Sequence, residues 1–251
     1  MRLHVLCLGH LQVDRGRILT PGIGDGEQIV IPIPAYLIET GEQRVLIDTG
    51  MNAVHVVDPE HTFRDTELAD ALLPMMTAED TVEQRLANIG LTTAEVTHVV
   101  NSHLHFDHCG QNGSFAGRPI IVQREQYEAA LGETTCPNEN FDLPELTYEL
   151  IEGERELFPG VRCILSPGHM PGHQSFLVDL PNSGRILLSI DAIYCADNVE
   201  HDAWGSQMDP DAARASARRL QQIAERERAR LVYGHDRAQW ASLRHSPQFY
   251  D

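Results

Sequence analysis

The sequence lacks paired cysteines and long apolar runs, and each absence excludes a class of protein. Its five cysteines are widely spaced and include no C-x-x-C pair, which argues against a zinc ribbon or a dithiol redox site and predicts reduced thiols. No segment is apolar over the roughly 18 residues that a membrane-spanning helix needs, and the apolar start of the chain has no signal-peptide cleavage pattern. We therefore expect a cytoplasmic protein with no membrane partner.

Positive charge is scarce as well. The chain carries 37 acidic against 19 basic residues, for a formal net charge of -18 at pH 7. Such a charge repels phosphate backbones and lacks the basic footprint of nucleic-acid binders, so we expect no nucleic-acid partner. Solubility and salt tolerance are equally compatible explanations of the acidic excess.

The chain shows no fixed-period repeat, low-complexity run or linker, and proline and glycine are spread along its whole length. Its 251 residues, 42% of them hydrophobic, suffice for one large core. We therefore expect a single domain over residues 1–251, although length alone also allows two small ones.

Apolar, β-branched segments between turn residues predict a series of strands. We place them at residues 1–11, 29–39, 44–48, 96–101, 119–123, 161–165, 174–180 and 185–189. Helices are predicted over residues 77–89, with Thr77 as N-cap and Gly90 as C-cap, and over residues 209–230, with Pro210 in the first turn. Short turns such as residues 182–184 join neighbouring strands, which favours an α/β fold with mixed sheets.

The strongest chemical signal is the segment His103-Leu104-His105-Phe106-Asp107-His108, which follows the strand predicted over residues 96–101. It places three imidazoles and a carboxylate close together, and zinc and similar metals readily bind imidazole nitrogen and carboxylate oxygen. A loop this dense in donors can supply two metal ions. A solvated polar loop is the alternative, and the donors that follow later in the chain make it the weaker one.

Three further donors stand where later apolar strands end. His169 lies in a Ser-Pro-Gly-His turn after residues 161–165, Asp191 follows residues 186–190, and His235 follows residues 231–234. The ends of strands are where open α/β sheets commonly carry their sites, so we expect these side chains to join the histidine-rich loop. His173 repeats the Pro-Gly-His pattern and is predicted to support a ligand rather than to be one.

The order H-x-H-x-D-H, Pro-Gly-His, strand-end Asp and Gly-His resembles the metallo-β-lactamase superfamily over nearly the whole chain. The resemblance implies an αββα sandwich with a binuclear zinc site at one edge, although other divalent metals suit the same donors. By the family pattern, His103, His105 and His169 would bind the first zinc, Asp107, His108 and His235 would bind the second, and Asp191 would bridge the two. Asp48 resembles a supporting carboxylate of the family and is left out of the ligand set.

Finer matches make the sequence similar to the lactonases that open N-acyl-homoserine lactones. They include the Ser-His-Leu-His-Phe-Asp-His and Gly-His-Asp segments and Tyr194, three residues after Asp191. His105 stands where diiron flavoproteins of the superfamily tend to have an acid, and Asp191 stands where many of its β-lactamases have a cysteine. The resemblance thus implies a metal-dependent hydrolase that quenches quorum signals. The related γ-butyrolactone hydrolases share much of the pattern.

The resemblance also assigns roles. A hydroxide that bridges the two zinc ions would attack the lactone carbonyl. Tyr194 would donate a hydrogen bond to the carbonyl oxygen, and Asp107 would pass a proton to the leaving alkoxide. An apolar groove would bind the acyl chain, with Phe106, Tyr194 and Phe63 as substrate-binding residues. Weaker candidates for the groove are Leu19, Met51, Phe141 and Trp204.

Other functions stay open at this point. Hydrolysis of γ-butyrolactone or another small lactone or ester would fit a short groove, and a thioesterase of the glyoxalase II kind would use the same metals. A non-catalytic metal-binding protein would need only the ligands, but the full ligand set and Tyr194 favour an enzyme. A small-molecule lactone is the expected partner, and a homodimer is compatible with the sequence.

Overall fold

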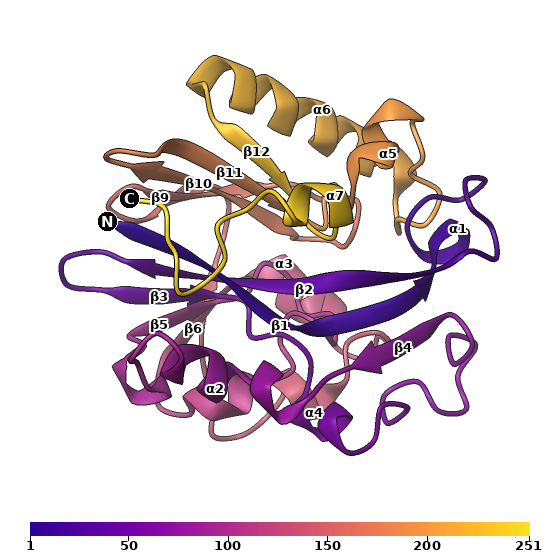
Figure 1. The fold of residues 1–251 in the computed structure, drawn as a ribbon, viewed down its shortest axis with the longest axis horizontal. Helices are drawn as coiled ribbons and strands as arrows, with labels where there is room; N and C mark the ends of the chain where they lie inside the picture. Colours follow the sequence, from indigo (N-terminus) through magenta and orange to yellow (C-terminus); the bar gives the residue numbers. More distant parts are fainter.

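Two β-sheets lie face to face with helices on their outer sides, as Figure 1 shows for the computed structural model, which describes residues 1–251. The seven-stranded sheet has the spatial order β4 (Leu72–Met75), β1 (Arg2–Asp14), β2 (Gln28–Glu39), β3 (Arg44–Ile47), β5 (His98–Val100), β6 (Pro119–Gln123) and β7 (Thr147–Ile151). The five-stranded sheet has the order β12 (Arg230–Tyr233), β11 (Gly184–Ile190), β10 (Gln174–Leu180), β9 (Val161–Leu165) and β8 (Arg155–Phe158).

Both sheets are mixed, as predicted. In the first sheet, β1, β2 and β3 pair antiparallel, whereas β3, β5, β6 and β7 pair parallel. In the second sheet, β10 is antiparallel to both of its neighbours, and β11 is parallel to β12. The predicted turn at residues 182–184 joins β10 to β11.

The core between the sheets draws side chains from both of them. Strand β2 shows the arrangement: Tyr36 and Ile38 face the other sheet, whereas Ala35 and Leu37 face helix α2 (Val82–Ala87) on the outer side. Successive side chains of a strand point to opposite faces, and both faces of this strand are buried. The strand is therefore apolar along most of its length instead of alternating with polar residues.

Helix α6 (Pro210–Glu227) covers the outer face of the second sheet (Figure 1). Its residues Leu220 and Ile223 pack against Ile164 of β9, and the side chain of Asp209 caps the first turn. The layering of helix, sheet, sheet and helix is the αββα sandwich that the family resemblance implied.

The remaining helices are short. They are α1 (Arg15–Ile18), α3 (Arg124–Ala130), α4 (Asn138–Phe141), α5 (Ala196–Glu200) and α7 (Arg237–Trp240), with 3-10 turns η1 (Ala53–Val56), η2 (Ala78–Asp80), η3 (Thr93–Glu95) and η4 (Asn112–Phe115). No helix combines the length and the apolar character that crossing a membrane requires.

Two predicted helices have different bounds in the structure. The helix expected over residues 77–89 is divided into η2 and α2, because Thr81 between them has an extended backbone (φ -67°, ψ 150°). Helix α6 ends at Glu227 rather than at Arg230, because Arg228 adopts a left-handed conformation with φ 53°. Strands β4, β7 and β8 were not predicted. All three lie at sheet edges. Polar residues weaken the apolar signal of β7 and β8, and β4 has only four residues, one of them Pro74, which argues against a strand.

Candidate metal centre and active site

Four segments that follow strands bring the predicted metal ligands together. The loop after β5 supplies His103, His105, Asp107 and His108, the turn between β9 and β10 supplies His169, Asp191 follows β11, and His235 follows β12. We call these seven side chains the floor. All of them are buried except His105, which is half-buried.

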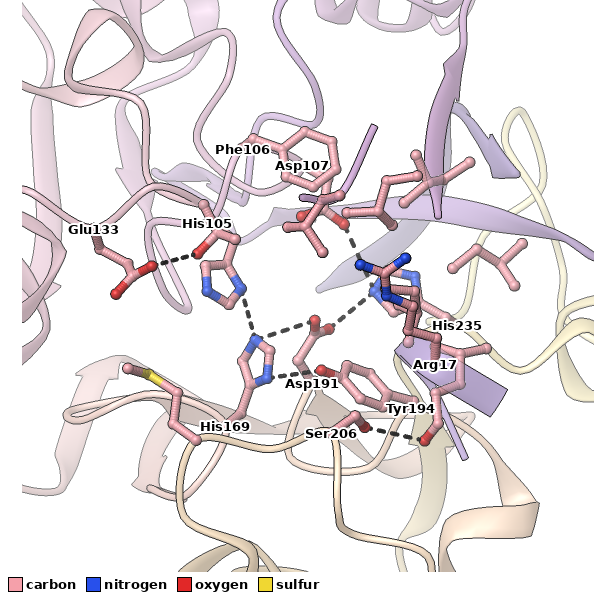
Figure 2. A pocket seen from close by; sticks show the side chains of 18 residues that line it. Arg17, His105, Phe106, Asp107, Glu133, His169, Asp191, Tyr194, Ser206 and His235 are labelled. Carbon is pink, nitrogen blue, oxygen red and sulfur yellow. Dashed lines mark hydrogen bonds and ion pairs between the residues drawn. The ribbon is translucent and has the colours of Figure 1, made fainter. Parts of the chain in front are cut away.

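The floor consists of two groups of donor atoms. One group is His103, His105, His169 and Asp191, the other is Asp107, His108 and His235, and within each group the donor atoms lie within 4.8 Å of one another. The Asp191 carboxylate faces both groups (Figure 2): Oδ2 lies 3.5 Å from Nε2 of His169, and Oδ1 lies 3.1 Å from Nε2 of His235. It therefore stands between the two groups, where the sequence predicts a bridging ligand.

The backbone is constrained just before two of these ligands. Gly168, which precedes His169, has φ 125°, and a Cβ at this position would lie 2.1 Å from the backbone nitrogen of Ala213 in α6. Ile190, which precedes Asp191, has φ 50°, a rare conformation for a β-branched residue. Gly168 lies in the turn after β9, and Ile190 is the last residue of β11. Each of them turns the chain so that the side chain of the next residue, His169 or Asp191, points to the floor.

Asp48, at the end of β3, orients two histidines of the floor. Its Oδ2 lies 2.9 Å from Nδ1 of His108 and accepts a hydrogen bond of 2.7 Å from the Ser102 hydroxyl. Because that hydroxyl gives its proton to Asp48, it acts as the acceptor for Nδ1 of His103, at 3.0 Å. Nε2 of both histidines is thus left to face the floor, which matches the supporting role predicted for Asp48.

Two further histidines are oriented in the same way. Nδ1 of His235 donates to the backbone carbonyl of Pro32 at 2.9 Å, and Nδ1 of His169 lies 3.0 Å from the side-chain oxygen of Gln207. With the proton on Nδ1, each ring presents the lone pair of Nε2 to the floor. His173 belongs to neither donor group and bonds the Ser166 hydroxyl at 2.9 Å, as expected of a supporting residue.

Burial keeps the histidines of the first group neutral. It is the largest influence on each of them, because a charged ring loses its hydration in the interior. Burial lowers the pKa of His105 to about 3 and holds the pKa of His103 and His169 well below the ordinary value. Neutral imidazole is the form that binds a metal ion.

In the second group, neighbouring carboxylates act against burial. Burial is the largest single influence on His108 and His235 and lowers their pKa, but Asp191 and Asp107 together outweigh it and raise the pKa of both rings. Burial also opposes the charge on Asp191, yet His235 and His108 hold its pKa well below the ordinary value. The Asp191 carboxylate therefore stays ionised and requires positive charge beside it.

The donor atoms fit divalent metal ions. The facing nitrogens of His103, His105 and His169 lie 2.8 to 3.2 Å apart, and neutral rings in a triangle cannot satisfy every lone pair by sharing protons. The buried atoms His108 Nε2 and Asp191 Oδ1 have no hydrogen-bond partner. Unpaired buried lone pairs are costly unless a cation binds them, and this set of nitrogens and oxygens suits borderline metals such as zinc.

Tyr194 lies beside the first donor group. Its hydroxyl is 3.0 Å from Nδ1 of His169. Burial, and then the charges of Asp191 and Asp107, raise the pKa of Tyr194 well above its ordinary value, so the phenol keeps its proton. Since Nδ1 of His169 is itself a donor, the phenol proton remains available for another oxygen in the cavity.

Five floor side chains line a cavity of about 370 Å³ (Figure 2): His105, Asp107, His169, Asp191 and His235. Tyr194 and Phe106 line the cavity next to the floor. We call the aliphatic part of the lining the wall: Leu11, Ile18, Leu19, Ile31, Leu68 and Leu72. A reactive floor beneath an apolar wall is typical of a site for a small molecule with an apolar tail.

A model of the metallo-beta-lactamase superfamily matches residues 29–235, a range that contains every residue of the floor. The chain belongs to this superfamily.

Its relatives within the superfamily are similar over their full length. The N-acyl homoserine lactonase AiiA of Bacillus thuringiensis subsp. kurstaki is 38% identical over 251 residues, covering 99% of this chain and 98% of the relative. The N-acyl homoserine lactonase AttM of Rhizobium johnstonii is 36% identical over 264 residues, covering 100% and 98%. A solved N-acyl homoserine lactone hydrolase, with N-hexanoyl-L-homoserine bound at its catalytic metal centre, superposes with a TM-score of 0.93 at 37% identity, covering 99% and 98%.

Not every residue proposed for the groove of this superfamily member lines the cavity. Phe106, Tyr194 and Leu19 do. Phe63 does not, which corrects its predicted position: it is 1% exposed and packs edge-on behind Phe106, with ring centroids 4.6 Å apart. The candidates that are instead buried in packing clusters are Met51, Phe141 and Trp204.

Several residues of the site were not predicted from the sequence. Arg17, Glu133 and Met208 line the cavity, and Gln207 orients His169. They lie in loops or one-turn helices that carry no periodic pattern. The only sequence signal near any of them is Asp209, the N-cap that fixes where the segment with Gln207 and Met208 enters α6.

Proposed function

We propose that this chain is a binuclear zinc hydrolase that opens the ring of N-acyl homoserine lactones and so removes quorum signals. The observation that carries the proposal is that floor side chains and the apolar wall line the same cavity: a lactone ring at the floor leaves its acyl chain against the wall. The names of the relatives and the acyl-homoserine product bound to one of them support the same substrate class.

In this proposal, the first donor group and the second donor group would each hold one zinc ion, and Asp191, whose carboxylate faces both groups, would serve both sites. Bound zinc supplies a Lewis acid that polarises the lactone carbonyl and brings the pKa of water near neutrality. The residues that line the cavity around the floor bind and orient the lactone.

Tyr194 donates a hydrogen bond to the carbonyl oxygen of the lactone, where negative charge develops as the ring opens. Its retained proton and its place in the lining suit this role. Water adds to the carbonyl carbon as the ring C–O bond breaks. Asp107, whose carboxylate also lines the cavity, takes the proton that the water gives up and passes it to the leaving alkoxide. Phe106 contacts the first part of the acyl chain.

We further propose that residues 1–251 form a single domain. The inter-sheet core supports this reading, because it draws on elements from Leu3 in β1 to Val232 in β12, near the two ends of the chain.

The proposal is tested by pH-stat measurement of acid release from hexanoyl- and decanoyl-homoserine lactone and from bare γ-butyrolactone, with zinc-loaded protein. We expect kcat/KM to be at least about tenfold higher for the acylated lactones, equivalent to about 1.4 kcal/mol of transition-state discrimination. The absence of acid release from every acylated lactone contradicts the proposal. Faster turnover of the bare ring would assign a small-lactone substrate to the same metal centre.

The role of Tyr194 has a separate test. Tyr194→Phe removes only the hydroxyl, and we expect kcat to fall about a hundredfold, as for the loss of one oxyanion donor. Tyr233→Phe is the control, because Tyr233 is a half-buried tyrosine outside the cavity lining. An unchanged kcat in Tyr194→Phe would remove the phenol from the mechanism.

A further inference from the structure

The cavity lining contains one guanidinium group, that of Arg17 in α1 (Figure 2). Wall residues Ile18 and Leu19 directly follow it in the chain. The other charged groups of the lining are the floor residues and Glu133. The proposed substrate is neutral, so it needs no arginine to balance a charge, and the presence of this side chain in the wall calls for another explanation.

The Arg17 side chain is held by hydrogen bonds to the loop before β4. Its Nη1 donates to Oδ1 of Asp70 at 2.8 Å, and its Nη2 donates to the backbone carbonyl of Glu67. Both partners belong to the loop before β4, the same loop that places Leu68 in the wall. The guanidinium carries further N–H donors that these two bonds do not use.

A contribution of the ion pair with Asp70 to folding stability does not explain why an arginine stands at position 17. The side chains of Arg17 and Asp70 are 44% and 82% exposed, and pairs as exposed as this one contribute little to the free energy of folding. The contacts with Asp70 and Glu67 do restrict the side chain, however, so that little conformational freedom is lost when a ligand accepts one of its remaining N–H groups.

Acyl chains of homoserine lactones differ chiefly in length and in whether C3 carries hydrogen or oxygen. An aliphatic wall accommodates a methylene at C3, but a carbonyl or hydroxyl oxygen there loses its hydrogen bonds to water and needs a donor in exchange. A guanidinium N–H provides a charge-assisted hydrogen bond, which is stronger than one between neutral groups.

We propose that Arg17 is a specificity-determining residue that donates a hydrogen bond to an oxygen at C3 of the acyl chain, so that the protein prefers 3-oxo-acyl lactones to unsubstituted ones. The inference rests on the proposed function and adds the substrate subclass. The floor opens the ring of both kinds of lactone, and Arg17 discriminates between them by the atom at C3.

The test compares kcat/KM for 3-oxo-octanoyl- and octanoyl-homoserine lactone, which differ only at C3. In the wild type we expect a ratio of about ten in favour of the 3-oxo substrate, near the lower limit for a hydrogen bond to a charged group because Arg17 is partly exposed. Arg17→Met should bring the ratio close to one by lowering only the value for the 3-oxo substrate.

Two variants serve as controls. Arg64→Met removes an arginine of the same loop that pairs with Asp58 and lies outside the cavity lining, and it should leave the ratio at its wild-type value. Asp70→Asn weakens one anchor of Arg17 but keeps its guanidinium, so most of the preference should persist.

A wild-type ratio near one overturns the inference without any variant. An equal loss for both substrates in Arg17→Met also overturns it, because that result assigns Arg17 to the shape of the wall. Both outcomes differ from failure of the proposed function, in which neither acyl lactone is hydrolysed at all.

Discussion

The floor and the wall of the cavity are stabilised in different ways. Floor side chains are mostly buried at the ends of strands, and second contacts fix their rings, as Asp48 does for His108. Half of the wall lies in strands, with Leu11 in β1, Ile31 in β2 and Leu72 in β4. The other half comes from α1, the residue that follows it and the loop before β4, and the exposed pair of Arg17 and Asp70 connects these segments. Moving the floor breaks buried hydrogen bonds, whereas the ion pair that joins α1 to the loop before β4 competes with solvent.

We expect the floor to determine the reaction and the wall to determine which lactone is preferred. A floor held by buried partners keeps its donor atoms in one arrangement whatever the acyl chain is, and the part of the wall that lies in α1 and the loop before β4 can change without disturbing that arrangement. Substitutions in the floor should therefore lower turnover of every lactone, and substitutions in the wall should change the preference among lactones.

The largest effect is expected from Asp191→Ala, because this one carboxylate faces both donor groups. We expect kcat/KM to fall at least about a thousandfold for every lactone, which corresponds to several kcal/mol of lost transition-state stabilisation. Bound metal, measured by elemental analysis, should fall with it.

The matched control is His201→Ala, since His201 belongs to an exposed group with Asp197 and Glu200 that also resembles a metal site. Wild-type metal content in Asp191→Ala would refute the assignment of the floor.

The same contrast explains what could be predicted from the sequence. The floor could be predicted because each ligand lies in a segment that follows an apolar strand, and strand ends meet at one place in this fold. His169 and His173 share the same tripeptide, and only the family pattern told them apart. Of the six wall residues only Leu19 was predicted, because the rest of the lining depends on contacts between segments far apart in the sequence. Arg17 bonds Asp70, 53 residues later, and Phe63 packs against Phe106 instead of lining the cavity. No periodic pattern records such contacts.

A smaller effect on the floor is expected from Asp48→Asn. Asp48 accepts hydrogen bonds from the backbone and the hydroxyl of Ser102 and from His108, and an amide nitrogen cannot replace the second acceptor oxygen. Because His108 then loses its orientation, we expect metal affinity to fall about tenfold to a hundredfold in a chelator competition assay. Asp179→Asn, at an exposed carboxylate of β10, is the control. Equal affinity in both variants would mean that the strands alone orient His108.

Leu68→Ala tests the wall. Leu68 is a half-buried wall residue in the loop before β4, and its truncation removes apolar contact with the end of a long acyl chain. We expect kcat/KM for the decanoyl lactone to fall about fivefold to tenfold, with little change for bare γ-butyrolactone, as is usual for the loss of a few methylene contacts. Met75→Ala, an exposed apolar residue of β4 outside the lining, should change neither value. An equal loss for both substrates would show that wall and floor are coupled.

The smallest effect is expected from Glu154→Gln, at an ion pair beneath the floor. Glu154 accepts a hydrogen bond of 2.9 Å from the backbone nitrogen of Leu165, at the start of the turn to His169, and its Oε2 lies 2.8 Å from Arg219 Nη2 of α6. The hydrogen bond from Arg219 lowers the pKa of Glu154 below its ordinary value. A carboxyl whose pKa is lower in the folded state stabilises the fold above its unfolded pKa, and this contribution is lost as pH falls through the folded value. Urea unfolding should therefore show wild type more stable than Glu154→Gln by up to about 1 kcal/mol at pH 7, and the difference should shrink below about pH 4.5.

Activity should stay at the wild-type level at pH 7, because the buried contacts of the floor do not depend on this pair. A large loss of activity would mean that a surface ion pair helps to set the floor, and the contrast with the wall would then fail.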